Sequence, residues 1–291
     1  MFAFAVWDSN KQQLFLARDR LGIKPLFYTL LDDRVFAFSS ELKALKTLPR
    51  LDRTIDPTAV EDYFSLGYVP EPKTIYRDTF KLKPGFSLLL ERGKPLSAPV
   101  CYWDLSCELQ PQRAQAQIEE ELVERLQEAV RIRMVSEVPL GAFLSGGVDS
   151  GSVVAMMAEL SKEPVKTCSI GFDSANFDET DYAKKVAQRY KTNHTENIVA
   201  SDDFDLVDKL SQLYDEPYAD SSAIPTFRVC QLAKQKVTVA LSGDGGDEHL
   251  AGYRRYCWHM NEERLRSRIP LSLRKNVFGP LGRFYPKADW A

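Results

Sequence analysis

The fold of this chain is constrained most strongly by one segment, in which a short apolar run ends at a glycine-rich turn and a helix follows directly. The stretch reads Pro139-Leu-Gly-Ala-Phe-Leu-Ser-Gly-Gly-Val-Asp-Ser150. Leu140 to Leu144 predicts a short buried strand, and apolar residues at helical spacing predict a helix from Ser150 to Leu160. The turn must therefore join a buried strand to a helix within a few residues.

The turn itself has the parts of a phosphate-binding loop. Gly146 and Gly147 let the backbone approach a ligand, and their N–H groups have no intrahelical partner. The positive end of the helix faces the same point, and Ser145 and Ser150 add hydroxyl donors. A structural alternative is a glycine-rich turn capped by an aspartate. The loop is not the P-loop of kinases and GTPases, because Gly-Lys-Ser and Gly-Lys-Thr are absent from the chain.

Asp149 is the informative residue of this turn. A carboxylate beside a polyphosphate is repulsive unless a divalent cation lies between them, so Asp149 predicts Mg²⁺. A helix terminus contributes only about 0.3–2 kcal/mol, which is too little for a nucleotide with several charges. A bound metal contributes more charge stabilisation than this.

The segment Ser145-Gly-Gly-Val-Asp-Ser150 resembles the pyrophosphate loop of the ATP pyrophosphatase group. That group includes asparagine synthetases, GMP synthetases and argininosuccinate synthetases. The resemblance implies that ATP is cleaved between its α and β phosphates. It also implies that Ser145, Gly146, Gly147 and Ser150 hold the departing pyrophosphate.

Length, charge and cysteine content narrow the class of protein. The 291 residues allow two domains, and the net charge of −3 gives no broad attraction to nucleic acid or membrane. No apolar run approaches membrane-spanning length, and residues 1–10 lack the basic start of a signal peptide. The five cysteines are scattered and form no C-x-x-C pair, which favours reduced, mostly buried thiols. We expect a cytoplasmic protein.

The first hundred residues predict a β-rich domain of short strands. Phe2-Ala-Phe-Ala-Val-Trp-Asp8 is apolar from its first residue, as buried central strands are, and we expect an exposed sheet edge where it begins. This segment, Ala17 to Tyr28 and Ser39 to Ala44 resemble the later half of the glutaminase domain of glutamine-hydrolysing asparagine synthetases. The resemblance implies a partial N-terminal nucleophile hydrolase-type domain over residues 1–108.

No glutaminase catalytic residue carries over from that family. Its catalytic cysteine is the first residue of the mature chain, whereas the first cysteine here is Cys101. The family's catalytic lysine in the second domain is not assignable either, since the resemblance ends near Arg283. The chain therefore resembles an internal piece of an asparagine synthetase.

The second domain is predicted over residues 113–291, after a polar linker at 109–116. A long helix from Ile118 to Met134 leads into the strand before the phosphate-type loop. Strands and helices then alternate, which predicts βαβ units and a parallel sheet. Their expected ranges are 165–170, 194–199 and 237–241 for strands and 179–190 and 204–213 for helices. The fold class is α/β plus α+β.

A second glycine-rich loop, Ser242-Gly-Asp-Gly-Gly-Asp-Glu248, follows the last of these strands. Ligands of open α/β sheets bind beyond the carboxyl ends of the strands, so both loops can share one metal. We predict that Asp149 and Asp247 hold Mg²⁺, the alternative being an acidic surface turn. The loop resembles the second ATP loop of asparagine synthetases, with Asp244 where that family often has glutamate.

The same resemblance implies further nucleotide contacts and a segment near the acceptor. Leu144 and Ile170 would touch adenosine, and Ser242, Gly243 and Asp244 would line the nucleotide. Leu144 and Ile170 are equally well explained as core residues at strand ends. The segment Asp215 to Pro225 either shapes the acceptor pocket or is a structural turn.

Together these features predict an ATP-dependent, asparagine synthetase-type amide ligase, a carbon–nitrogen ligase that takes nitrogen from glutamine or ammonia. Aspartate or a related carboxylate would be adenylated, with Mg²⁺ and ATP as the expected cofactors. One alternative is an amidotransferase acting on another carboxylate, such as a cell-surface sugar or a peptide. Another is a catalytically incomplete nucleotide-binding fragment. A homodimer is compatible with the sequence, which does not decide the oligomeric state.

Overall fold

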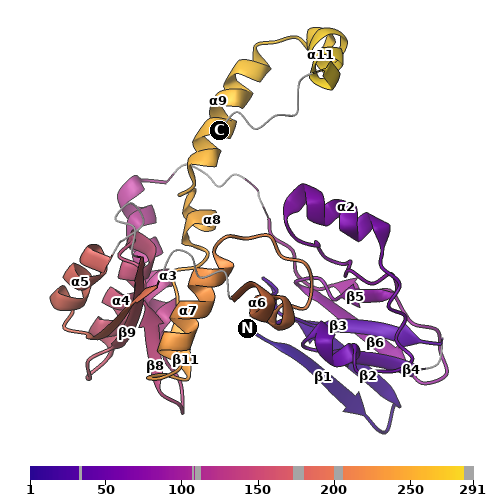
Figure 1. Ribbon diagram of the computed structural model, residues 1–291, viewed down its shortest axis with the longest axis horizontal. Coiled ribbons are helices and arrows are strands. Elements are labelled where there is room, and N and C mark those ends of the chain that lie inside the picture. The colour runs from indigo at the N-terminus through magenta and orange to yellow at the C-terminus, as the bar shows by residue number, and fades with distance from the viewer. Residues whose placement is uncertain (33–34, 107, 109–112, 173–179, 200–205, 285–291) are drawn as a thin grey trace. The chain divides into compact units, whose positions relative to one another are not determined.

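A computed structural model describes residues 1–32, 35–106, 108, 113–172, 180–199 and 206–284 (Figure 1). The chain divides into two compact units. The first comprises Met1–Ile118 and Ala200–Arg228, and the second comprises Glu119–Val199 and Val229–Ala291. A segment that the sequence places in the second domain therefore packs with the first unit.

Antiparallel strands and short helices make up the first unit. The elements are β1 Ala3–Asp8, β2 Gln13–Arg18, β3 Phe27–Leu31, β4 Val35–Ser39, α1 Leu42–Leu45, α2 Pro57–Leu66, β5 Thr79–Lys81, β6 Phe86–Glu91, β7 Val100–Cys101 and α6 Val207–Leu213. One sheet has the order β1-β2-β6-β7 and the other has the order β4-β3-β5. Every strand pair in both sheets is antiparallel.

Three hydrophobic clusters lie within the described part of this unit, one around α6 and the start of the helix that follows it and two in the β-rich half. Leu16 of β2 and Leu88 of β6 pack with Tyr28 of β3, so this cluster joins the two sheets. Phe27 and Leu31, elsewhere on β3, belong instead to a cluster with α1. The alternation along β3 places successive side chains on opposite faces, as strand geometry requires.

Strand β1 departs from the prediction of a buried central strand. It lies at the edge of its sheet, paired only with β2 among the described strands. Phe4, Val6 and Trp7 are exposed because no described element covers this end of the sheet.

The turn between β2 and β3 is braced by two buried polar side chains. Arg18 donates to the carbonyls of Lys24 (2.9 Å), Leu82 (2.6 Å) and Gly22 (2.9 Å) and pairs with Glu71. Asp19 accepts from the backbone N–H groups of four residues: Phe2, Leu21, Ile23 and Lys24. Burial alone would raise the pKa of Asp19, but these donors bring its pKa below the ordinary value.

The second unit is built on a parallel sheet with helices on both faces. Its elements are α3 Gln115–Arg133, β8 Leu140–Phe143, α4 Val148–Leu160, β9 Lys166–Phe172, α5 Thr180–Arg189, β10 Asn193–Val199, α7 Ala223–Ala233, β11 Val239–Leu241, α8 Gly246–Leu250, α9 Arg254–Ser267, α10 Leu271–Leu273, η2 Arg274–Phe278 and α11 Gly279–Phe284. The divisions between the units fall inside α3, directly after β10 and inside α7. The strand order is β10-β9-β8-β11, and all three pairings are parallel.

Opposite faces of this sheet carry separate clusters. Ala142 and Leu144 pack with α3, α4 and α5, through Val130, Val154 and Ala183 among others. Phe143 and Ala240 belong to a cluster with Leu232 and Ala233 of α7. The architecture confirms the expected β-rich domain followed by a parallel α/β domain.

Several finer predictions are settled in detail. The predicted linker lies partly outside the described residues, and α3 already begins at Gln115. Glu179 and Phe204, where two helices were expected to begin, also lie outside them.

Cys168 is buried, but Cys101, Cys230 and Cys257 are exposed, so the prediction of mostly buried thiols is wrong for the described cysteines. Cys101 is exposed because β7 is a two-residue strand at the other edge of its sheet.

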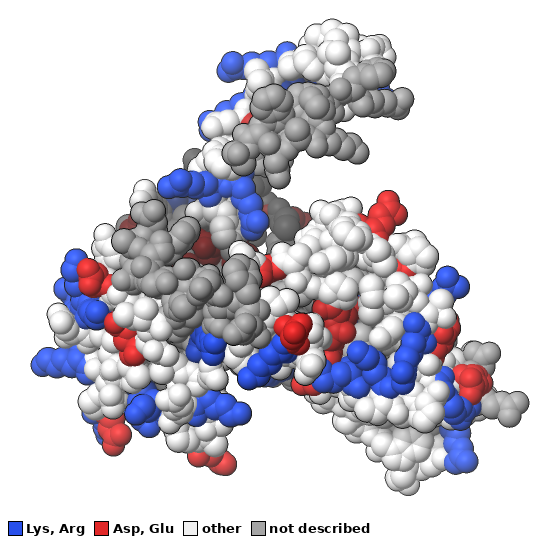
Figure 2. All heavy atoms as spheres, in the orientation of Figure 1, with Lys and Arg blue, Asp and Glu red and all other residues white. Residues whose placement is uncertain are grey.

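Charged side chains of both signs lie on the surface of the first unit (Figure 2). Lysine, arginine and acidic side chains intermingle over the face of the first unit that Figure 2 shows. Among the helices that the structure describes, none has the length and apolar character needed to cross a bilayer.

Candidate functional site

The two glycine-rich loops meet where the strand order of the parallel sheet reverses. From β8 the chain continues through β9 to β10 on one side, and β11 then returns to the other side of β8. Val239, Ala240 and Leu241 pair in parallel with Leu140, Gly141 and Ala142, so both strands end at the same edge. Such a reversal is where open α/β sheets bind ligands.

The loop after β8 is ordered by its two serines. Their hydroxyl oxygens lie 2.9 Å apart, and Ser150 Oγ accepts from the Ser145 N–H at 3.2 Å. Ser145 Oγ accepts from the Gly147 N–H at 3.3 Å. Gly146 has φ 88°, which a residue with a side chain rarely adopts, and Gly147 is the N-cap of α4 without a side-chain cap. The start of a 13-residue helix is therefore left open to an anion.

The loop after β11 turns tightly into the short helix α8. Ser242 Oγ donates to Asp244 at 2.9 Å, and the Gly246 N–H donates to the Gly243 carbonyl at 3.2 Å. Gly245 has φ 93° and precedes the helix. The hydroxyl and carboxylate here lie at the surface rather than in the core.

The two loops touch through glycines that leave no room for a side chain. A Cβ at Gly243 would lie 2.6 Å from the Ser150 backbone nitrogen, and a Cβ at Gly246 would overlap the carboxylate of Asp149. These glycines therefore bring the second loop against the first turn of α4. The prediction that both loops belong to one site rests on this contact and on the pairing of β8 with β11.

The remaining predicted residues divide between the loop edge and the core. Leu144 is 1% exposed and lies in the cluster with α4, and its N–H donates to the Cys168 carbonyl at 2.9 Å. Ile170 is half-buried on β9, the neighbouring strand. Leu144 therefore has the core role that the sequence also allowed, and an adenosine contact for either residue stays a prediction.

The donor set suits a magnesium ion that is shared with phosphates. The described residues include no cluster of three or more histidine, cysteine or acidic side chains able to hold a metal alone. Mg²⁺ is usually bound by one or two carboxylates together with phosphate and water oxygens. Asp149 lies against the second loop, whereas the carboxylate of Asp247 lies against Gly252. Asp149 is the better placed of the two predicted ligands.

A tyrosine–glutamate pair next to the second loop was missed in the sequence. Tyr253 donates to Glu248 Oε1 at 2.6 Å. This hydrogen bond is the main cause that raises the pKa of Tyr253 to about 12. An acid five residues before a tyrosine is too common a pattern to have indicated the contact.

His194 of β10 is hydrogen-bonded to the neighbouring strand β9. Its ring nitrogens lie 2.9 Å from Thr167 Oγ1 and 3.2 Å from Ser169 Oγ. Burial lowers the pKa of His194, so the neutral ring is favoured. The residue is a hydrogen-bonded part of the sheet.

Family models cover both units. The model described as Asparagine synthase matches residues 121–289. The chain belongs to the asparagine synthase family. A model described as Glutamine amidotransferase domain matches residues 1–103. The asparagine synthases are carbon–nitrogen ligases, so the chain comes from an enzyme family.

Curated relatives match over most of this chain. A provisionally named glutamine-hydrolyzing asparagine synthetase 2 from Methanocaldococcus jannaschii is 43% identical over 269 residues, covering 91% of this chain and 51% of the relative. Glutamine-hydrolyzing asparagine synthetase 1 from Bacillus subtilis is 35% identical over 277 residues, covering 94% and 43%. Amidase chry2 from Gibberella zeae is 30% identical over 274 residues, covering 87% and 40%. The chain spans about half the length of these relatives or less.

Proposed function

We propose that the second unit binds Mg·ATP and activates a carboxylate by adenylation, as part of a glutamine-dependent asparagine synthetase. The observation that carries this proposal is the contact between the two glycine-rich loops at the strand-order reversal. A free carboxylate is a poor electrophile because it has no good leaving group. Transfer of AMP to it, with release of pyrophosphate, supplies one, and ammonia from glutamine then displaces AMP to form the amide.

The first loop would bind the phosphates that leave as pyrophosphate. Ser145 and Ser150 offer hydroxyl groups, and Gly146 and Gly147 offer backbone N–H groups at the start of α4, the Gly147 N–H in exchange for its bond to Ser145 Oγ. These groups are fixed before any ligand arrives, so binding costs little further ordering. Their hydrogen bonds would compensate the charge that develops on the departing pyrophosphate.

Asp149, with Asp247, would hold a magnesium ion on the phosphates, and the ion would supply charge neutralisation. Asp149 already faces the second loop. On the second loop, Ser242, Gly243 and Asp244 would line the nucleotide, with Asp244 oriented by the Ser242 hydroxyl. The backbone of Leu144, whose side chain lies in the core, and Ile170 would lie beside adenosine.

Aspartate is the acceptor that we propose, and a different carboxylate is the second candidate. The names of the Methanocaldococcus and Bacillus relatives support aspartate, while the name of the Gibberella relative is that of an amidase. Because the two loops bind ATP rather than the acceptor, they do not distinguish these candidates. We further propose that the protein acts in the cytoplasm on soluble substrates, with no nucleic acid or membrane as partner.

Exchange of labelled pyrophosphate into ATP tests the adenylation step directly. With Mg²⁺ and aspartate, the protein should incorporate label into ATP, and the Ser145→Ala, Asp149→Ala double variant should not. Glutamate serves as the matched control acid. Exchange that needs another carboxylate would favour the second candidate, and a folded protein without exchange for any acid would contradict the proposed step.

A further inference from the structure

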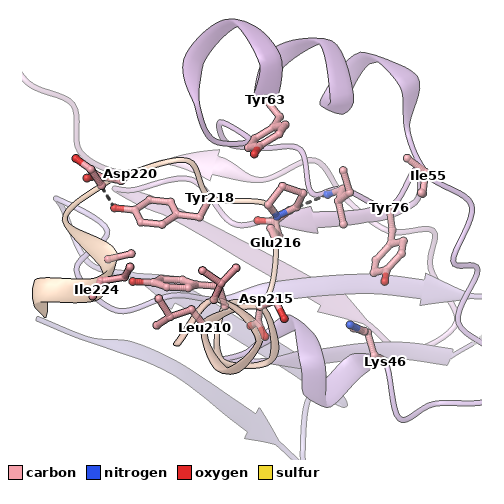
Figure 3. Close-up of a pocket in the computed structure, with 17 residues that line it drawn as sticks. Lys46, Ile55, Tyr63, Tyr76, Leu210, Asp215, Glu216, Tyr218, Asp220 and Ile224 are labelled. Carbon is pink, nitrogen blue, oxygen red and sulfur yellow. Dashed lines mark hydrogen bonds between the residues drawn. The ribbon is translucent and has the colours of Figure 1, made fainter. Parts of the chain in front are cut away.

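The first unit contains a cavity of about 620 Å³, well separated in sequence from the two glycine-rich loops (Figure 3). It lies between α6 with the segment that follows it and residues 46–76 of the β-rich half. Every lining residue belongs to this unit. The volume falls within the roughly 300–1,000 Å³ of small-molecule sites.

Aromatic rings form much of the wall. Tyr214 and Tyr218 stack with their ring centroids 4.8 Å apart and an angle of 26° between the ring planes. Tyr63 of α2 and Tyr76 line the cavity from the β-rich half (Figure 3). Leu210 adds an apolar side chain from α6. Flat rings around an apolar interior suit a flat, aromatic molecule.

The acids of the cavity are already occupied. Asp215 accepts from the N–H groups of Leu42 (2.6 Å) and Lys43 (3.2 Å). Glu216 accepts from the Ile75 N–H at 2.7 Å and pairs with Lys81. Asp220 accepts from the Ser222 N–H and the Tyr218 hydroxyl. These carboxylates therefore hold the wall in place and offer little to a ligand.

The donors of the cavity, in contrast, remain available. Within the described part of the chain, no hydrogen-bond partner is found for the Lys46 ammonium or for the hydroxyls of Tyr63 and Tyr76. Figure 3 shows the Lys46 ammonium and the Tyr76 hydroxyl directed toward the same end of the cavity. One cation with two neutral donors matches a single negative charge with two acceptor oxygens.

We propose that this cavity binds a small aromatic carboxylate. Its ring would lie against the tyrosines, and its carboxylate would accept hydrogen bonds from Lys46 and Tyr76. The wall is preformed, since Asp215 and Glu216 attach it to segments more than a hundred residues away in the chain. The cavity includes the segment from Asp215 to Ile224, for which the sequence allowed either an acceptor-pocket or a structural role. The proposed binding goes beyond the proposed adenylation step and does not depend on nucleotide binding.

Ligand-observed NMR and calorimetry with indole-3-carboxylate test this proposal, in the absence of ATP. Neutral indole-3-carboxamide is the matched probe, because it keeps the ring and removes the charge. The carboxylate should bind at least about tenfold more tightly than the amide, as expected for a charge-assisted contact. Equal affinity for the two probes, or binding of neither, would overturn the proposal.

Substitutions in the cavity test whether the probe binds there. Lys46→Met should weaken carboxylate binding by about tenfold, and Tyr76→Phe by a smaller factor. Lys11→Met removes an exposed lysine outside the cavity and should change nothing. Ser211→Trp places a large ring in the cavity and should abolish binding of both probes. Unchanged binding by folded Lys46→Met and Ser211→Trp proteins would show that the probe binds elsewhere and would overturn the assignment.

Discussion

The two units use polar residues at strand ends in opposite ways. The turn after β2 contains charged residues and a glycine. In it, Arg18 donates to backbone carbonyls and Asp19 accepts from backbone N–H groups of the same turn. The loop after β8 uses only serine hydroxyls for its internal bonds and leaves the helix start uncapped.

This difference shows why composition alone does not identify a binding loop. Both segments are polar and glycine-containing, and both follow a strand. They differ in whether a charged side chain of the segment forms hydrogen bonds with the segment's own backbone N–H and carbonyl groups. The β2–β3 turn is closed by its charged residues. In the β8–α4 loop the Ser145 and Gly147 N–H groups donate to serine hydroxyls, but no side chain caps the start of α4, which stays open to a ligand.

Arg18→Met gives the largest expected effect and tests the closed turn. The change leaves three carbonyls without their donor, those of Lys24, Leu82 and Gly22. Removing a buried, hydrogen-bonded charge of this kind costs about 3–5 kcal/mol. Urea unfolding of the first unit should show this loss. Arg20→Met, which removes an exposed arginine near Trp103, is the control and should cost less than about 1 kcal/mol.

Gly243→Ala tests the open loop. The added Cβ would lie 2.6 Å from the Ser150 nitrogen and 3.0 Å from Asp149 Cβ, so one loop must move. We expect ATP affinity to fall at least about a hundredfold, because a displacement of the donors removes several phosphate contacts. Titration calorimetry with Mg·ATP measures the dissociation constant of each protein.

Gly151→Ala is the matched control for that change. Its Cβ would meet only Val186 at 3.9 Å, and Gly151 lies inside α4. ATP affinity should be retained, while helix stability should rise by up to about 1 kcal/mol. Equal loss of affinity in both variants would contradict a specific role for the contact at Gly243.

The open-loop side of this contrast was predictable from sequence, because its causes are local. Apolar runs located β8 and α4, and the alternation of strands and helices predicted the parallel sheet. Ser145 to Ser150 and Ser242 to Glu248 were recognised as loops at strand ends. Their meeting follows from the pairing of β8 with β11, which local patterns allow but do not determine.

The attachment of residues 206–228 to the first unit was not predictable. It depends on single hydrogen bonds across long stretches of chain, such as the bond from the Leu42 N–H to Asp215 and the bond from the Ile75 N–H to Glu216. The sequence around Asp215 does not show whether its carboxylates bind distant backbone N–H groups or water. Similarly, the apolar composition of β1 predicted burial, but the sheet order places it at an edge.

Asp19→Asn tests the same closed turn through its pH dependence. Because the folded protein holds this carboxylate below its ordinary pKa of 3.8, Asp19 stabilises the fold above that pH. The stabilisation is lost as pH falls through the lowered pKa. Wild type should exceed the variant by about 1–2 kcal/mol near neutral pH. The two should converge on acidification, and a constant difference across pH would contradict this role.

Glu216→Gln has the smallest expected effect and the opposite sign. Burial raises the pKa of Glu216 even though Lys81 and the Ile75 N–H act to lower it. Ionisation therefore costs stability as pH rises above 4.5, its ordinary value, and through the raised pKa. Wild type should lose stability relative to the variant as pH rises from 4.5 through the raised pKa of Glu216. A relative gain over that range would mean that pairing with Lys81 outweighs burial.

Calorimetric titration of the wild-type chain and the Ser145→Ala, Asp149→Ala variant with ATP is the most direct test of the open-loop account. Binding should require Mg²⁺ and disappear in the folded double variant. A folded wild-type chain that does not bind Mg·ATP, or a variant that binds it equally well, would contradict the assignment of these loops to a nucleotide.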